Sequence, residues 1–154
     1  MAISGITPET CARTVMETIP MVMRSIRREM RRHRVAELSV PQLRTLAFLD
    51  RNPGACLFKV ADHLGVTRPT ASVIIDRLVR RGLLLRAEDP RERRKIVITL
   101  TPKGARVLEQ ARNATRSWLA GVLAPWPLAT LRRIEAGAGL LGQVFKQAGD
   151  GDGK

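Results

Sequence analysis

The hydrophobic positions in the middle of the chain predict one helix followed by a two-stranded hairpin. On the helix, the apolar residues recur every three or four positions and so share one face: Ala71, Ile74, Ile75 and Leu78. Gly82 follows at the place where a helix end favours left-handed backbone. The apolar runs 83–85 and 96–100 then flank a charged stretch, which predicts two short strands joined by a tip.

Two further helical segments are predicted before this unit. The first begins at Thr7-Pro8 and has an apolar seam at intervals of three and four, formed by Met16, Ile19, Met23, Ile26 and Met30. Pro20 is expected to divide that segment into two helices, because proline cannot donate a backbone hydrogen bond. Ser39 to Gln42 fits a capping box at the start of the next helix, and Asn52-Pro53-Gly54 ends it.

A short helix and a turn come directly before the helix of residues 68–80. Val60, Ala61 and Leu64 form the apolar side of the short helix, and Gly65 ends it. Thr67 is suited to cap the start of the helix that follows. Two short helices joined by such a turn predict a helix-turn-helix.

The outward side of the second of these helices carries groups that suit DNA. We call them the predicted recognition residues: Thr67, Arg68, Thr70, Ser72, Val73 and Arg77. Hydroxyls and guanidinium groups can bind base edges and phosphates, and the valine suits a thymine methyl. The alternative is an ordinary solvated face, where Lys and Glu would be expected instead.

The tip of the hairpin, Glu88-Asp89-Pro90-Arg91-Glu92-Arg93-Arg94-Lys95, is strongly basic. Asp89-Pro90 favours a turn, and four cations follow, namely Arg91, Arg93, Arg94 and Lys95. An arginine-tipped ribbon fits the narrow, electronegative minor groove, where Glu92 is expected to brace Arg94 by an ion pair. The alternative, a surface loop with no partner, leaves four clustered cations to repel one another.

The stretch from Leu38 to Gly104 resembles the DNA-binding core of the MarR family of bacterial regulators. The resemblance lies in spaced elements that occur in order: LSVPQLRTLAFL, KVADHLGVTRPTASVIIDRLVRRGLL, DPRERRK and LTPKG. It implies a mainly α fold, in which a winged helix-turn-helix domain with a two-stranded β wing is flanked by N- and C-terminal dimerisation helices. Glu92 replaces the usual wing Asp two residues before Arg94, and Val73 replaces a side chain that is polar or basic in many relatives.

The C-terminal part of the chain predicts two more helices. Thr101-Pro102 opens a long one, which ends at Pro125-Trp126-Pro127, and the last helix has an apolar seam of Leu128, Leu131, Ile134, Ala138, Leu141 and Phe145. A winged domain of roughly 65 residues cannot cover these seams, so a homodimer is expected. The predicted division is N-terminal dimerisation helices in 1–37, the winged domain in 38–101, C-terminal dimerisation helices in 102–147 and a disordered tail in 148–154.

The composition of the chain limits the classes of molecule that it is expected to bind. The 154 residues include 27 basic and 14 acidic side chains, a formal net charge of +13, which favours polyanions and would suit DNA, RNA or anionic lipid. Tyrosine is absent and aromatic residues total 3%, which disfavours RNA readers that stack bases. No apolar run predicts a membrane span, and the start MAISGITPET lacks the features of an export signal, so a cytoplasmic location is expected.

Regulators of the MarR family usually respond to a small aromatic or anionic molecule held between the dimer helices and the winged domain. A basic stripe at helical spacing offers candidate contacts to such an effector in Arg24, Arg27 and Arg31. The alternative is an exposed basic face that pairs with local acids or lies near DNA.

Other chemistries have weaker support. Cys11 near a helix start is a candidate redox switch, although a packed or idle thiol is favoured and tyrosine partners are absent; Cys56 is the second thiol. His33 and His63 lie in separate segments without zinc-ligand spacing, so neither a metal nor another cofactor is predicted. No nucleophile and base are placed together, and no glycine loop could cradle phosphate, so an enzyme is not expected.

The sequence therefore predicts a ligand-responsive, dimeric repressor of a pseudo-palindromic double-stranded DNA operator. A redox-sensing regulator that switches through Cys11 and a non-specific architectural DNA-binding protein remain alternatives. An architectural protein would show little sequence preference, whereas a regulator should retain a large specificity ratio.

Overall fold

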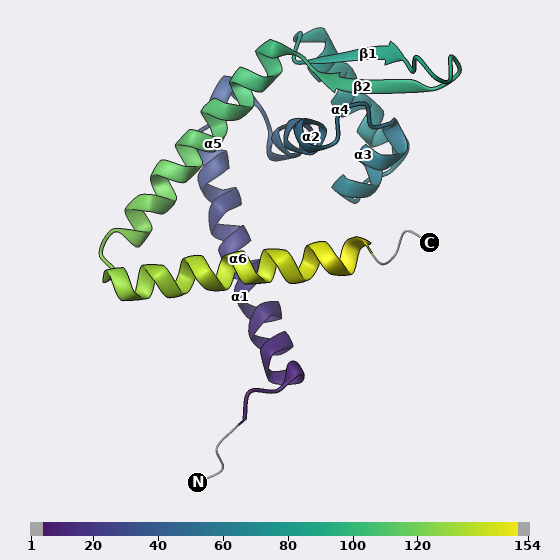
Figure 1. Ribbon diagram of the computed structural model, residues 1–154. Helices are drawn as coiled ribbons and strands as arrows, with labels where there is room; N and C mark the ends of the chain where they lie inside the picture. The colour runs from purple at the N-terminus through teal and green to yellow at the C-terminus, as the bar shows by residue number, and fades with distance from the viewer. Residues whose placement is uncertain (1–4, 151–154) are drawn as a thin grey trace. The chain divides into compact units, whose positions relative to one another are not determined.

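The computed structural model describes residues 5–150 and contains helices and one hairpin (Figure 1). In chain order the elements are α1 (Pro8–Arg32), a 3-10 turn (Val35–Glu37), α2 (Val40–Arg51), α3 (Leu57–Leu64), α4 (Arg68–Arg80), β1 (Leu84–Glu88), β2 (Ile96–Leu100), α5 (Pro102–Leu123) and α6 (Leu128–Asp150). The two strands form an antiparallel sheet. The predicted mainly α fold with a two-stranded wing is confirmed.

The chain forms two compact units, and the boundary between Arg116 and Ser117 falls within α5. The predicted division at residues 37, 101 and 147 differs from this boundary and stays a prediction. The predicted tail also differs, because α6 continues to Asp150 and so includes its first three residues. The rest of that tail, 151–154, lies outside the described residues.

Helix starts follow local hydrogen-bonding rules. Thr7 and Thr10 form a capping box at α1, and Ser39 and Gln42 form another at α2. In the second box, the backbone N–H of Ser39 donates to Gln42 Oε1 at 2.9 Å. Each box satisfies backbone donors that a helix end leaves free. Both predicted starts are confirmed.

The predicted break at Pro20 is wrong. The helix α1 runs without interruption from Pro8 to Arg32, with Pro20 inside it. A proline removes only one backbone donor, and the turns on either side keep their own hydrogen bonds. The apolar seam of this segment therefore belongs to one 25-residue helix.

The core of the first unit lies between the helices α2 to α4, the wing and the start of α5. Its fully buried side chains include Leu46, Leu49, Val60, Ile75, Leu78, Leu83, Leu84 and Ile98. Ala71, Ile75 and Leu78 are 0% exposed, and Ile74 packs against the core with partial burial. The face of the helix 68–80 predicted to be buried is therefore the buried face of α4.

The wing is anchored to the core at its base. Leu84 pairs with Leu100, and Glu88 pairs with Ile96 at the other end of the sheet. Ala55 adds an isolated antiparallel bridge to Ile98. Figure 1 shows the hairpin extending away from α2. The base of the wing is thus held by the core, and its tip projects beyond it.

Two glycines shape the junction of α4, the wing and α5. Gly82 has a φ of +71°, as predicted for a residue just after a helix end. At Gly104, an added Cβ would lie 2.2 Å from the carbonyl oxygen of Leu83, so only glycine allows this close approach. Thr101 strengthens the junction, because its hydroxyl donates to the carbonyl oxygen of Gly82 at 2.6 Å.

The long helices carry large apolar side chains that remain exposed. On α1 these include Met16, which is 74% exposed, and Met21, which is 60% exposed. On α6 they are Leu128, Ile134, Leu140, Val144 and Phe145. No helix of the described residues is both long and apolar enough to cross a membrane.

Candidate nucleic-acid interface

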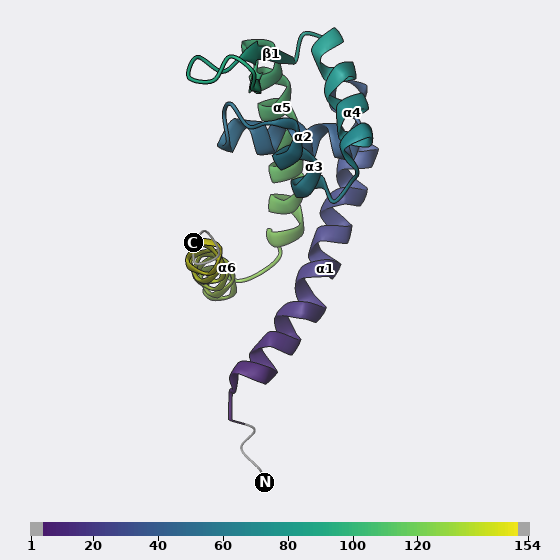
Figure 2. The same cartoon turned by 90° about the vertical axis from the view of Figure 1, so that its right-hand side faces the viewer.

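The helices α3 and α4 form the predicted helix-turn-helix. Gly65 ends α3 in left-handed backbone, with a φ of +68°, and α4 packs beside α3 (Figure 2). Leu64 of α3 and Ile75 of α4 both enter the hydrophobic core. The turn therefore presents one face of α4 outward while the other is fixed by packing.

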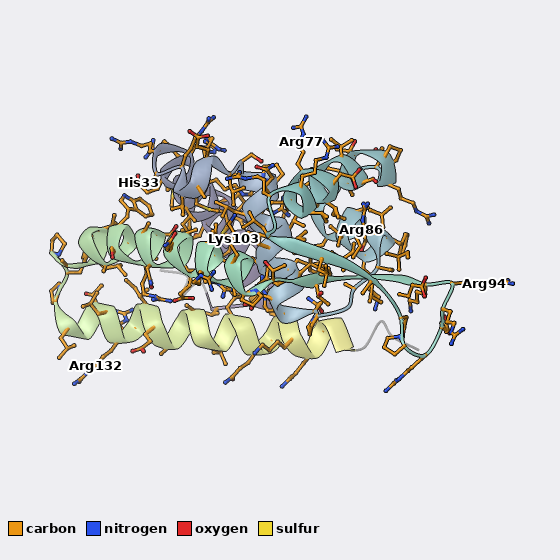
Figure 3. The ribbon with its side chains drawn as sticks, turned by 90° about the horizontal axis from the view of Figure 1, so that it is seen from above. His33, Arg77, Arg86, Arg94, Lys103 and Arg132 are labelled. Atoms are coloured by element: carbon orange, nitrogen blue, oxygen red, sulfur yellow. The ribbon has the colours of Figure 1, made fainter. Side chains whose placement is uncertain are left out.

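The structure places most of the predicted recognition residues on this outward face. Thr67, Arg68, Thr70, Val73 and Arg77 are exposed, whereas Ser72 is half-buried. Arg77 projects away from the rest of the first unit in Figure 3. The residues are thus brought together on one surface, with Ser72 at its less accessible edge.

Thr67 and Thr70 act first as a cap of α4. The backbone N–H of Thr70 donates to Thr67 Oγ1 at 3.4 Å, and the two hydroxyl oxygens lie 2.9 Å apart. A threonine side chain at this position satisfies a free donor at the helix start. The predicted N-cap at Thr67 is confirmed, and its hydroxyl therefore helps to set where α4 begins.

Arg68 lies over an aromatic ring that our sequence analysis missed. The guanidinium carbon of Arg68 is 5.0 Å from the ring centroid of Phe58 on α3. Phe58 is 56% exposed. The available signal was a large aromatic residue at the start of α3 in a chain with only three phenylalanines.

The basic residues of the wing are exposed around a defined turn. The backbone N–H of Asp89 donates to the carbonyl oxygen of Lys95 at 2.8 Å, and that of Arg91 donates to Asp89 Oδ1 at 2.9 Å. Arg94 lies at the far end of the hairpin in Figure 3. These bonds make the tip an ordered turn, rather than an open loop, at the end of the sheet.

The predicted brace between Glu92 and Arg94 has no counterpart in the described part of the chain, where no ion pair joins the two side chains. Glu92 contributes through its backbone, because its carbonyl oxygen accepts from the N–H of Lys95 at 2.8 Å. The brace between the two side chains stays a prediction.

A second feature missed by sequence analysis joins the wing to the recognition helix. Arg86 of β1 and Asp76 of α4 form an ion pair with an N···O distance of 2.6 Å. The two residues are separated by the turn at Gly82, so neither helical nor strand periodicity could pair them. The ion pair connects the two elements predicted to contact DNA.

Six basic side chains of this surface form no ion pair in the part of the chain that the structure describes. Within residues 5–150, no ion pair involves the cations predicted to contact DNA, which are Arg68, Arg77, Arg91, Arg93, Arg94 and Lys95. Their charges are thus not neutralised by the protein. Such a surface attracts phosphate groups.

The candidate effector residues line two neighbouring cavities beside α1. Arg24, Arg27 and Arg31 border a cavity of about 540 Å³ together with Met23. Arg27 and Met23 also border a second cavity of about 280 Å³, whose other lining residues are Met30, Val40, Arg44, Ala47, Arg51 and His63. The structure therefore brings Arg27 together with cations of α2 that our sequence analysis did not select.

His63 lines the smaller cavity beside the positively charged side chains of Arg44 and Arg51. Its ring stacks on Phe48 at a centroid distance of 4.5 Å, and Arg44 donates to the carbonyl oxygen of His63 at 3.1 Å. The pKa of His63 is lowered, first by its partial burial and then by the positive charges of Arg44 and Arg51. The cavity thus combines cationic groups with the apolar side chains of Met23 and Met30.

The two cysteines are free and lie in different settings. Cys11 is exposed on α1, and Cys56 is half-buried at the N-cap of α3. The backbone N–H of Lys59 lowers the pKa of the Cys56 thiol by stabilising its thiolate.

Within the described residues, no group of three His, Cys, Asp or Glu side chains could hold a metal ion. His33, one of the two histidines, has its Nε2 atom 2.7 Å from Oε1 of the buried Glu29 carboxylate on α1.

Comparison with known proteins finds a family similar to the winged domain. Residues 36–95, which run from the start of the core to the end of the wing tip, match the sequence profile of the MarR family. The winged domain is therefore similar to the MarR family over these residues. No curated protein sequence gives a significant match.

Solved structures of MarR proteins have the same fold over most of the chain. A MarR family protein from Bacillus stearothermophilus is 19% identical, with a TM-score of 0.76 over 92% of this chain and 99% of that one. The apo form of MarR from E. coli is 20% identical, with a TM-score of 0.70 over 90% and 98%. A MepR mutant from S. aureus bound to an oligodeoxyribonucleotide is 18% identical, with a TM-score of 0.59 over 91% and 99%.

Proposed function

We propose that this chain is a transcriptional regulator that binds double-stranded DNA in a sequence-specific manner. The supporting observation is that α4 and the wing tip of one MarR-type domain carry six exposed cations that form no ion pair within residues 5–150, namely Arg68, Arg77, Arg91, Arg93, Arg94 and Lys95. A structural neighbour of the chain, the MepR mutant, is bound to an oligodeoxyribonucleotide. The role involves DNA binding and no catalysis.

In this proposal α4 enters the major groove and the wing tip enters the adjacent minor groove. The N-terminal residues of a recognition helix reach base edges, which here are Arg68 and Thr70. Val73, which is exposed, suits the methyl group of thymine. Arg94 at the wing tip suits a narrow A·T-rich minor groove.

The mixed chemistry of the surface favours a regulator over an architectural protein. Charge alone would explain attraction to any DNA, and the formal net charge of +13 supplies it. The outward face of α4 also presents hydroxyl and methyl groups, which carry sequence information in the major groove. A large ratio of specific to non-specific affinity is therefore expected.

The proposed active form is a homodimer. The supporting observation is the exposed apolar side chains of α1 and α6, which a soluble monomer would leave in water. In this proposal, 1–37 and 102–147 are the dimerisation segments. Two recognition helices would then read half-sites about 10 to 10.5 bp apart, or a multiple of that distance, within a pseudo-palindrome. A cytoplasmic location accompanies this role.

We further propose that a small anionic molecule releases this regulator, a repressor, from its operator. Support comes from Arg27, which borders both cavities beside α1, and from Arg44 and Arg51 in the smaller one. These three arginines have no ion-pair partner among residues 5–150. Guanidinium groups bind carboxylates in a bidentate manner, and the nearby methionines suit an apolar body.

Selection of binding sites from random duplex DNA tests the central proposal. We expect enrichment of one pseudo-palindromic sequence and, by fluorescence anisotropy, at least about a thousandfold tighter binding to it than to random DNA. Arg77→Ala should weaken this binding, whereas Arg132→Ala, which removes an exposed cation of α6 that forms no ion pair among the described residues, serves as the control for net charge. No enriched sequence, or equal affinity for all DNA, would favour the architectural alternative.

Light scattering at micromolar concentration tests the assembly. The expected mass is twice that of the 17.1 kDa chain. A mass of one chain would contradict the dimer without affecting the assignment of the DNA-binding surface.

A further inference from the structure

Phe58 is an exposed aromatic residue that does not pack into the hydrophobic core. It is the second residue of α3 and is 56% exposed, and it is absent from the core cluster and from the side chains packed against that cluster. Leu57 and Val60, one and two positions away in the sequence, do pack into the core. Packing therefore gives no reason for a large ring at this position.

The ring of Phe58 instead faces Arg68, the first residue of the recognition helix. The guanidinium carbon lies 5.0 Å from the ring centroid, within the range of a cation–π interaction. Within the described residues Arg68 forms no ion pair. The aromatic ring is thus the group that holds this guanidinium in the absence of DNA.

A guanidinium group that packs against an aromatic ring keeps its hydrogen-bonding edge free. A guanidinium group interacts with a ring through its flat face, while its N–H donors point outward in the plane of the group. An arginine side chain also has high rotamer entropy, so a support that fixes its plane lowers the cost of forming a paired contact. Phe58 can therefore prepare Arg68 for a bidentate hydrogen bond.

We propose that Phe58 is a positioning residue that holds Arg68 for bidentate recognition of a guanine in each operator half-site. Arg68 is at the N-terminal end of α4, where residues of a recognition helix reach base edges. Guanine is the base whose O6 and N7 atoms match the donors of arginine. The pair therefore sets specificity at one G·C base pair, and this inference rests on the proposed function.

The test begins with the operator selected by the unmodified protein. If no sequence is selected, the proposed function itself fails, and that result is distinct from failure of this inference. With an operator in hand, each G·C pair is replaced in turn, and affinity is measured for the unmodified protein, Phe58→Ala, Arg68→Ala and the double variant. Thermal unfolding of each variant, together with binding to random DNA, detects a purely structural effect.

We expect Phe58→Ala to weaken operator binding about two- to fivefold, the size of an exposed cation–π interaction. The loss should concern the same G·C pair whose discrimination Arg68→Ala removes, and the double variant should bind no more weakly than Arg68→Ala. Phe58→Tyr should retain discrimination, since it keeps the ring. Phe58→Leu should lose it, since leucine preserves an apolar side chain without a π face. Leu85→Ala removes an equally exposed apolar side chain, 56%, and should leave discrimination unchanged.

Three results would overturn the inference. Additive losses in the double variant would mean that Phe58 acts independently of Arg68. An equal loss on operator and random DNA would assign Arg68 to a phosphate group. Full discrimination in Phe58→Leu would show that the ring is not needed.

Discussion

Asp76 on α4 and Arg86 on β1 form an ion pair of 2.6 Å across the junction between the recognition helix and the wing. The side chains are 35% and 39% exposed, so solvent weakens the attraction. Such a pair contributes little to stability but limits the directions that the two elements can take. In the proposed complex α4 and the wing enter adjacent grooves together, so their relative orientation is expected to matter for binding.

The first prediction concerns this pair. Arg86→Ala or Asp76→Asn should lower the free energy of unfolding by about 1 kcal/mol or less, as for other partly exposed pairs. Operator affinity should fall more than affinity for random DNA, since only the specific complex requires both elements in register. Thermal unfolding and fluorescence anisotropy measure the two effects. The reversed pair, Asp76→Arg with Arg86→Asp, should recover part of the specificity, and equal losses on all DNA would contradict the proposed role.

The wing gives the second prediction. Arg94→Ala should weaken binding to sites with a narrow A·T-rich minor groove and reduce the salt slope by about one ion per subunit. The measurement is the affinity as a function of salt concentration. Arg132→Ala, which removes one exposed cation from α6, is the matched control and should leave the slope unchanged. An unchanged slope for Arg94→Ala would remove the wing tip from the interface.

The third prediction separates two hydroxyls of the recognition helix. Thr70→Ala should cost about 1 to 3 kcal/mol on the operator and much less on random DNA, because base contacts specify while phosphate contacts position. Ser72 is half-buried, so Ser72→Ala should have the smaller effect. Thr70 also shares the cap at Thr67, and thermal unfolding must therefore accompany the binding assay. Equal losses on both kinds of DNA would mean that the base-reading residues lie elsewhere.

The local features of this fold could be predicted from the sequence. The caps at Thr7, Ser39 and Thr67 depend on residues within three positions, and the left-handed backbone at Gly82 depends on a single residue. Pro20 was misjudged because its local cost is small compared with the hydrogen bonding of a 25-residue helix. Sequence rules describe the local cost of a proline, but they do not show whether the hydrogen bonds of the whole helix outweigh that cost.

The features that span elements could not be predicted in this way. Phe58 and Arg68 lie on different helices, and Asp76 and Arg86 lie on a helix and a strand. The distance within each pair depends on how the core packs the two elements together. The periodicity of apolar residues in the sequence contains no information about that packing. For the same reason Arg44 and Arg51 were not recognised as neighbours of Arg27.

The fourth prediction concerns the thiol at the start of α3. Backbone N–H groups, chiefly that of Lys59, lower the pKa of Cys56 in the folded protein. In a Cys11→Ser variant, alkylation by iodoacetamide should therefore reach half its maximal rate at a lower pH in the folded protein than in urea. The same shift stabilises the folded state fully above the unfolded pKa of the thiol, and this contribution is lost as pH falls through the folded pKa. A higher midpoint in the folded protein would contradict this prediction.

The last prediction tests the proposed effector site. An anion can release DNA only if it binds better to a conformation that binds DNA poorly, so effector and operator must weaken each other's binding by the same factor. Isothermal titration with an aromatic carboxylate such as benzoate, with and without operator DNA, measures both factors. Arg27 lines both cavities, and Arg27→Ala is therefore expected to abolish the response while leaving operator affinity without benzoate largely intact. Arg31 lines only the larger cavity and Arg44 only the smaller one, so Arg31→Ala and Arg44→Ala show which cavity binds the anion.

Cys11→Ser should change neither effector response nor DNA binding. Release of DNA by an oxidant, lost in Cys11→Ser, would replace the anion site with a redox switch.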